Sequence, residues 1–331
     1  MSRQFSLEKA ADVAAVAALL QIGVELGVDR VLDSGDTFDV ADLAKATDVP
    51  VRGIEEYVAA LVAAGLVVET DVPGQYRVAE DFAASKYQAG YVSWAMNANQ
   101  PFLDNVRAFL TDREAAARVH RRDGRRVAVS SRWMAERAVY PGIIDQVNAA
   151  GAQRVTDLGA GTGGLLIQLL LDDPAREGVA LDVSPAACAA AREAADRGGV
   201  SDRLEVAERS IESLVEDAAP VEGAEAILAS FAMHDVLQDE ALCHAVLRRC
   251  HQALPSNGFM VVADAVSYAQ SRGERQFSAL FTYVHANFMD IRLPSEHKWQ
   301  ETFRAAGFTT VKSLSQVLPG SRLFVATKRE G

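Results

Sequence analysis

The stretch of sequence that decides the fold is RVTDLGAGTGG, residues 154–164. Its first five residues form the pattern of a short buried strand, and the apolar run at 165–171 begins a helix. Glycines between a strand and a helix permit a tight turn and let the backbone approach a ligand closely. This segment therefore predicts the first strand, turn and helix of an open α/β sheet, with a ligand site at the turn.

Further strand-like runs alternate with helical stretches after this turn. They lie at residues 179–183, 204–207, 226–231, 259–263, 310–318 and 323–327. Such alternation indicates a largely parallel sheet covered by helices on both faces. Only residues 319–322 separate the last two runs, which is too short for a crossover. The sequence thus predicts a seven-stranded α/β domain over residues 151–331 that ends in an antiparallel hairpin at a sheet edge.

The N-terminal part has a different, mostly helical pattern over residues 1–100. Two helices joined by a turn precede strand-like runs at 66–69 and 75–78, which is the order of a winged helix. Residues 38–78 carry three basic and seven acidic side chains, a poor surface for phosphate. An architectural or dimerising module is therefore favoured over a DNA-binding one. Residues 101–150 are predicted to form a helical connector that contributes to the substrate pocket. Most of its nine arginines are expected to form a solvated face, and one or two could reach a substrate carboxylate.

Composition limits the partners and the compartment. The chain has 331 residues and a net charge of −12, which makes nucleic acid a poor partner. Its three cysteines, an odd number, cannot form a disulfide framework, and no apolar run is long enough to cross a bilayer. Without a visible signal peptide, these features predict a cytoplasmic protein without a membrane partner.

The glycine-rich turn has an unusual spacing for a nucleotide-binding loop. Asp157 is followed by Gly159, Gly161 and Gly163, and Asp182 ends the second strand about twenty residues later. This arrangement resembles the signature of class I methyltransferases, which use S-adenosylmethionine. The resemblance implies that the glycines contact the methionine part of that cofactor. It also implies that Asp182 binds the ribose hydroxyls.

The resemblance extends over nearly the whole chain. The order of features along the chain is similar to that of the plant-type O-methyltransferase superfamily. These features are a winged-helix dimerisation domain, a connector, the glycine turn, a His-Asp pair after the fourth strand, the segments LRRCHQALPSNG and WQETFRAAGF, and a final hairpin. This resemblance implies a Rossmann-like seven-stranded methyltransferase sheet and a homodimer. Cofactor contacts are also implied for Ser210, Ile211 and Ser230. Where the family often has Gly-Asp-Phe, this chain has Arg209, Ser210 and Ile211, so its adenine contact is expected to be weaker.

Two histidines are the candidates for chemistry. His234 and Asp235 follow the fourth strand, and parallel sheets bind ligands beyond the C-terminal ends of their strands. In an O-methyltransferase, His234 would act as the general base. His285 lies in an aromatic stripe, where a buried histidine with a single hydrogen bond is the simplest interpretation. It could instead face the earlier pair, since this helix covers the substrate pocket in the superfamily.

With His285, the His-Asp pair would make a facial triad of two imidazoles and a carboxylate. This set is similar to the metal-dependent α-keto acid (phenylpyruvate-like) C-methyltransferases. The resemblance implies that His234, Asp235 and His285 bind one divalent metal, iron being favoured over zinc or cobalt. The metal would chelate an α-keto acid as its enolate for methylation at the β-carbon, in nonribosomal-peptide or other antibiotic biosynthesis, with Arg118 assisting the carboxylate.

Two alternatives stay open. The first is a metal-free O-methyltransferase of a phenolic or polyketide substrate, with His234 as the general base. The second is a winged-helix regulator that senses S-adenosylmethionine, which the acidic winged helix disfavours.

Overall fold

The computed structural model describes residues 7–328. The chain divides into two compact units, Met1–Arg137 (unit 1) and Ala138–Gly331 (unit 2). The boundary falls inside the predicted connector, 101–150, so the connector is not a separate body. Its last helix, α10 (Tyr140–Ala150), belongs to unit 2 because it packs against strand β8 (Phe259–Ala265).

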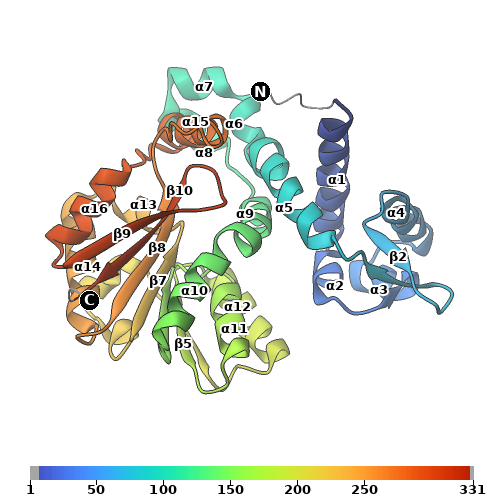
Figure 1. The fold of residues 1–331 in the computed structure, drawn as a ribbon. Helices are drawn as coiled ribbons and strands as arrows, with labels where there is room; N and C mark the ends of the chain where they lie inside the picture. Colours follow the sequence, from blue (N-terminus) through green and yellow to red (C-terminus); the bar gives the residue numbers. More distant parts are fainter. Residues whose placement is uncertain (1–6, 329–331) are drawn as a thin grey trace. The chain divides into compact units, whose positions relative to one another are not determined.

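Unit 1 is mostly helical, with one small sheet (Figure 1). Its helices are α1 (Leu7–Leu26), α2 (Asp29–Ser34), α3 (Val40–Thr47), α4 (Val51–Ala63), α5 (Phe82–Val92), the π-helix η1 (Ser93–Ala98), α6 (Gln100–Asp104), α7 (Val106–Thr111), α8 (Arg113–Val119) and α9 (Gly124–Ala138). Its strands are β1 (Phe38–Asp39), β2 (Val67–Glu69) and β3 (Gln75–Val78), in the antiparallel order β1-β3-β2.

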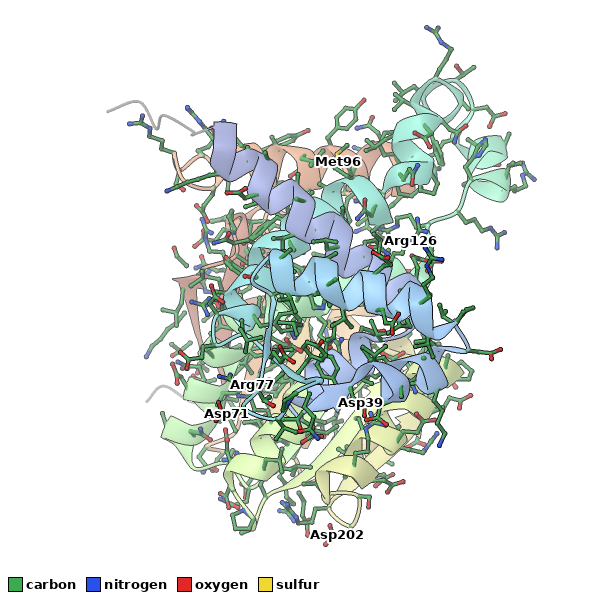
Figure 2. The ribbon with its side chains drawn as sticks, turned by 90° about the vertical axis from the view of Figure 1, so that its right-hand side faces the viewer. Asp39, Asp71, Arg77, Met96, Arg126 and Asp202 are labelled. Atoms are coloured by element: carbon green, nitrogen blue, oxygen red, sulfur yellow. The ribbon has the colours of Figure 1, made fainter. Side chains whose placement is uncertain are left out.

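The predicted winged-helix pattern is confirmed. The side chain of Asp39 caps α3 by accepting a hydrogen bond from the amide of Asp42, and Asp48 ends that helix in a left-handed conformation. Helices α3 and α4 then bury their apolar faces in one core, while β2 and β3 form the wing. Figure 2 shows the acidic Asp39 and Asp71 and the basic Arg77 on the side of unit 1 that faces the viewer. The wing therefore carries mixed charge.

Several arginines of the connector form ion pairs inside unit 1. Arg132 contacts Asp33 of α2 at 2.6 Å, and the buried Lys86 contacts the same carboxylate at 2.7 Å. Arg125 pairs with Asp29 at 2.9 Å. These pairs tie α9 and α5 to α2, so part of the arginine-rich stretch has a structural role.

Unit 2 is a seven-stranded sheet in the order β6-β5-β4-β7-β8-β10-β9. Its other strands are β4 (Arg154–Leu158), β5 (Glu177–Asp182), β6 (Leu204–Glu208), β7 (Ala226–Ser230), β9 (Thr310–Ser315) and β10 (Ser321–Thr327). Its other helices are α11 (Gly164–Asp172), α12 (Pro185–Gly198), η2 (Ile211–Val215), η3 (Ala219–Val221), α13 (Met233–Val236), α14 (Glu240–Ala253), α15 (Arg275–Val284), the π-helix η4 (His285–Met289) and α16 (Glu296–Ala305).

The Rossmann-like sheet and its final hairpin are confirmed. Strands β6, β5, β4, β7 and β8 are parallel, and β10 pairs antiparallel with both β8 and β9, so β9 is the edge strand. Helices α10 to α12 cover one face of the sheet, and α13, α14 and α16 cover the other (Figure 1). A continuous core of buried side chains, including Leu158, Ile227 and Phe303, holds the second face. This architecture places the C-terminal ends of β4, β5 and β7 next to one another.

Cys188, Cys243 and Cys250 are all buried and free. Over the described range, 7–328, no helix is both long and apolar enough to cross a membrane.

Candidate active site

The glycine turn lies between β4 and α11 and requires glycine for two different reasons. Gly159, Gly161 and Gly163 all have positive φ, at 74°, 57° and 74°. A Cβ added to Gly159 would also lie 2.6 Å from the Cβ of Ala232, whereas one added to Gly161 would meet nothing within 4 Å. The turn therefore packs tightly against the segment after β7 at Gly159 and stays open at Gly161.

Asp182, at the end of β5, is held against this turn. Its Oδ2 accepts a hydrogen bond from the amide of Gly161 at 2.8 Å, and its Oδ1 accepts one from the amide of Ser184 at 2.9 Å. The side chain is only partly buried. Because each carboxylate oxygen has a second lone pair, Asp182 keeps acceptor capacity for a ligand hydroxyl at the open part of the turn.

Asp157 is a buried acid directly below the turn. It is 2% exposed, and its Oδ1 has no hydrogen-bond partner among the described residues. Burial, together with the nearby negative charge of Asp182, raises the pKa of Asp157 to about 7. A buried acceptor without a donor is costly, and a cationic ligand group would satisfy it. The site thus fits the ammonium and the ribose of S-adenosylmethionine at Asp157 and Asp182.

The remaining predicted cofactor residues lie around the same sheet edge. Ile211 is buried, and its Cδ1 is 3.8 Å from where a Gly159 Cβ would stand. The carbonyl of Ser210 accepts hydrogen bonds from the amide and hydroxyl of Ser213, and Ser210 is the N-cap residue directly before η2. Ser230 ends β7 and is partly buried. No interaction of these side chains tests their predicted cofactor contacts, which stay predictions.

The backbone after β7 is strained. Phe231 has a φ of 54°, a rare conformation for a bulky residue, and its amide donates to the carbonyl of Ala263 at 2.8 Å. Strain of this kind persists only where surrounding contacts enforce it. The result is a sharp exit from the strand into α13, which carries His234 and Asp235.

His234 is buried and oriented by an acid that the sequence analysis missed. Asp264 on β8 is fully buried, and its Oδ1 lies 2.7 Å from His234 Nδ1. Asp264 also accepts hydrogen bonds from the backbone amides of His234 and Ala265. Because a carboxylate only accepts, the network assigns the proton to Nδ1 and makes Nε2 the acceptor. The signal in the sequence was an acid inside an otherwise apolar strand, FMVVADA, since buried acids are rare without a function.

The structure brings His285 to His234. Their ring centroids are 5.5 Å apart at an interplanar angle of 81°. His285 is 4% exposed; its Nδ1 donates to the carbonyl of Phe281 at 2.7 Å, and its ring stacks on the Phe281 ring at 4.1 Å. Asp235 Oδ1 lies 3.6 Å from His234 Nε2, with 60% of its side chain exposed. The two histidines therefore face each other beyond the C-terminal ends of the strands.

These three side chains are of the right chemical type for iron, zinc or cobalt. Within residues 7–328, however, no group of three or more His, Cys, Asp or Glu side chains is arranged so that it could hold a metal ion. His234, Asp235 and His285 thus do not fit the predicted metal as they are placed. No catalytic step is derived through one.

Arg118 lies in α8 of unit 1, with its side chain 73% exposed. Its Nη2 is 3.9 Å from the exposed Glu114 one turn earlier, and exposed pairs of this kind are weak. Its predicted contact with a substrate carboxylate stays a prediction.

A cavity of about 470 Å³ opens in unit 2 at the opposite end of the sheet. It is lined by the N-terminal ends of β4, β5 and β6, among them Arg154, Glu177 and Leu204. Open parallel sheets bind their ligands at the C-terminal ends of the strands, so this cavity is not the catalytic site.

Comparison with known proteins relates the chain to methyltransferases. Residues 150–307 match the model of a methyltransferase domain. The chain is 28% identical over 268 residues to 3-hydroxy-5-methyl-1-naphthoate 3-O-methyltransferase of Streptomyces sahachiroi, covering 74% of this chain and 72% of the relative. It is 34% identical over 144 residues to 2,7-dihydroxy-5-methyl-1-naphthoate 7-O-methyltransferase of Streptomyces carzinostaticus, covering 44% and 41%.

A solved structure shares the fold. The apo form of the S-adenosylmethionine-dependent methyltransferase SibL matches with a TM-score of 0.59 and 20% identity, covering 96% of this chain and 97% of that one. The match of residues 150–307 to a methyltransferase domain, together with the glycine turn, supports an enzyme that transfers a methyl group from S-adenosylmethionine. Over most of its length the chain is similar in sequence to the naphthoate 3-O-methyltransferase of Streptomyces sahachiroi.

Proposed function

We propose that this enzyme transfers the methyl group of S-adenosylmethionine to a hydroxyl oxygen of a small aromatic acceptor. The observation that carries the proposal is the buried pair of His234 and Asp264, 2.7 Å apart, at the end of the sheet where the glycine turn lies. A histidine with a fixed tautomer is suited to removing a hydroxyl proton.

The donor side of the site is formed by the first two strand ends. When bound, S-adenosylmethionine supplies a methyl group made electrophilic by its sulfonium. Asp157 would hold the donor's ammonium, Asp182 its ribose hydroxyls, and the open turn at Gly161 would let the ligand approach the backbone. In these roles the carboxylate oxygens of Asp157 and Asp182 accept hydrogen bonds from the ligand.

On the acceptor side, His234 Nε2 takes the hydroxyl proton while the oxygen forms its bond to the methyl carbon. The carbon–sulfur bond breaks, and its electron pair stays on sulfur. His234 becomes an imidazolium, which the buried carboxylate of Asp264 stabilises through Nδ1. General-base catalysis of this kind contributes a factor of roughly 10²–10⁴ in rate.

An aromatic acceptor is supported by side chains near His234. Phe277, Phe281 and Phe231 form a connected aromatic cluster that ends on His285, with centroid separations of 4.1 to 6.2 Å. Aromatic rings stack favourably on planar acceptors. The names of two relatives also describe methylation of hydroxyl groups on naphthoates. A place in secondary metabolism, such as antibiotic biosynthesis, is part of this proposal.

C-methylation of an α-keto acid is the second candidate. It is favoured by one observation, the edge-to-face contact of His285 with His234. Each imidazole also donates its Nδ1 proton to an oxygen, as metal-binding histidines commonly do. Because the three side chains as placed do not fit a metal ion, while His234 with Asp264 fits a metal-free base, O-methylation is preferred.

A mass-spectrometric screen tests the proposal. The purified enzyme with S-adenosylmethionine is incubated with hydroxynaphthoates, other phenols and 2-oxo acids, next to the variant His234→Asn and the control His244→Asn. We expect methylation of phenols by the wild type and the control, with loss in His234→Asn. Methylation of 2-oxo acids alone would support the second candidate. Homodimerisation, a cytoplasmic location and the absence of nucleic-acid partners remain predictions.

A further inference from the structure

The side chain of Gln238, between α13 and α14, forms hydrogen bonds with the main chain of Arg292, 54 positions later in sequence, and with the main chain of His234. Its Nε2 donates to the carbonyl of His234 at 2.7 Å and lies 3.4 Å from the carbonyl of Arg292. Its Oε1 accepts a hydrogen bond from the amide of Arg292 at 2.9 Å. The amide of Gln238 thus pairs with Arg292 as a neighbouring strand would, while also binding His234.

The same path continues to the second histidine. Ile291, next to Arg292, donates its amide hydrogen to the carbonyl of His285 at 2.9 Å. Hydrogen bonds therefore lead from the main chain of His234 through Gln238 to residues 291–292, and from there to His285. Sequence reasoning assigned no role to Gln238.

The Gln238 link acts in addition to the direct contact between the two imidazole rings. His234 and His285 meet edge to face, and His285 otherwise packs on Phe281 at the junction of α15 and η4. Side chains that meet only through apolar or aromatic packing can shift relative to one another. A side-chain amide whose nitrogen and oxygen both form hydrogen bonds holds its partners at a defined distance. Gln238 is exposed, so its bonds compete with water and contribute only about 0.5–1.5 kcal/mol each to folding. A role in spacing fits this position better than a role in overall stability.

We propose that Gln238 is a positioning residue that sets the distance between the His234 and His285 imidazoles. This inference rests on the proposed function, because it assigns Gln238 to the methyl transfer for which His234 is the base. Gln238 acts through the two main chains and does not act on substrate.

Two variants of the full-length enzyme test the link. Gln238→Met keeps the length of the side chain and removes both hydrogen-bonding groups. Gln238→Glu keeps the shape but turns an acceptor toward the carbonyls of His234 and Arg292. The matched controls are Gln252→Met and Gln252→Glu, on the exposed part of α14. In both Gln238 variants we expect kcat to fall about tenfold while the KM for S-adenosylmethionine stays at the control value.

Amide hydrogen exchange supplies a readout that does not need turnover. We expect faster exchange at residues 285–292 in both Gln238 variants, with unchanged exchange in β4 and β7. Values of kcat equal to those of the Gln252 controls would overturn the proposal, as would a donor KM that rises together with the loss in kcat. If the wild type methylates no acceptor, the proposed function fails, and unchanged exchange at 285–292 would then reject the link separately.

Discussion

The Oδ1 atom of Asp264 lies 2.7 Å from Nδ1 of His234, although the two residues are 30 positions apart in sequence and on different elements. Both side chains are buried, at 0% and 5% exposure. The parallel pairing of β7 with β8 brings the turn after β7 over the end of β8. A carboxylate in this position holds the imidazole in one tautomer, and that tautomer is the one a base requires.

Replacing Asp264 by asparagine tests the tautomer directly. The carboxylate accepts three N–H groups, from His234 Nδ1 and from the amides of His234 and Ala265. An amide has a single oxygen, so in Asp264→Asn its NH₂ group must face one of these donors. Where the NH₂ group faces Nδ1, the imidazole proton moves to Nε2, which removes the base. We expect kcat to fall by at least about tenfold with unchanged affinity for S-adenosylmethionine.

Steady-state kinetics and calorimetric titration with S-adenosylmethionine measure both quantities. The control is Asp217→Asn, which removes an exposed partner of Arg209. An unchanged kcat in Asp264→Asn would mean that Asp264 does not orient the base.

Donor binding is predicted to depend on pH through Asp157. Burial raises the pKa of Asp157 to about 7, from an ordinary value of 3.8. The neutral acid therefore stabilises the folded state fully below about pH 4, and this contribution is lost as the pH rises through 7. An ammonium ligand prefers the ionised form. Affinity for S-adenosylmethionine should therefore rise from pH 5.5 to 7.5, with release of a proton at the lower pH.

Calorimetry in two buffers of different ionisation enthalpy detects that proton. In Asp157→Asn, binding should weaken and lose this pH dependence, and the free protein should gain stability at pH 8. Binding by the wild type without proton release at pH 6 would contradict the assignment.

The contact between Gly159 and Ala232 can be measured by a double-mutant cycle. Gly159→Ala places a Cβ 2.6 Å from that of Ala232 in addition to the strain of a positive φ. Gly161→Ala has the strain without the contact. We expect Gly159→Ala to lower the free energy of unfolding by about 1–3 kcal/mol more than Gly161→Ala, and Ala232→Gly to restore part of it.

Urea unfolding of the single and double variants measures the coupling. Additive effects of Gly159→Ala and Ala232→Gly would show that the glycine turn and the segment before His234 do not touch.

Metal removal separates the two candidate functions. Because the described side chains form no three-ligand group, we expect dialysis against EDTA to leave kcat for a phenolic acceptor unchanged. Elemental analysis of the same samples is the control. A stoichiometric metal that is lost together with activity, and absent from His285→Ala, would favour C-methylation.

The sequence predicted what depends on local pattern. Apolar runs bounded by glycine and polar residues marked all seven strands, and the run 154–158 coincides with β4. The length of 319–322 was enough to predict the hairpin, but not that β10 inserts between β8 and β9, because that order depends on packing between distant segments. A helical connector was predicted over residues 101–150, and the boundary between the two units lies inside this range, after residue 137, because it depends on packing.

Only those parts of the site that depend on local pattern and strand order were predicted. His234 and Asp182 follow strand ends, so their common location could be inferred from topology. Asp264 binds His234, 30 positions away in sequence, and Gln238 binds Arg292, 54 positions away. Contacts between such distant residues leave no periodic pattern in a single sequence. For His285 the sequence left two interpretations open, a buried histidine with one hydrogen bond and a histidine that faces His234, and the structure shows both features. Whether three donors converge on a metal depends on side-chain geometry that spacing does not determine.

The most direct test of the central claim is to identify the acceptor atom to which the methyl group becomes bound. Wild-type enzyme is incubated with S-adenosylmethionine carrying a ¹³C-labelled methyl group and with its best acceptor, and the product is examined by NMR. Our account predicts a methyl group bound to oxygen, formed by the wild type and lost in His234→Asn. A methyl group bound to carbon, or an O-methyl product formed at the wild-type rate by His234→Asn, would contradict it.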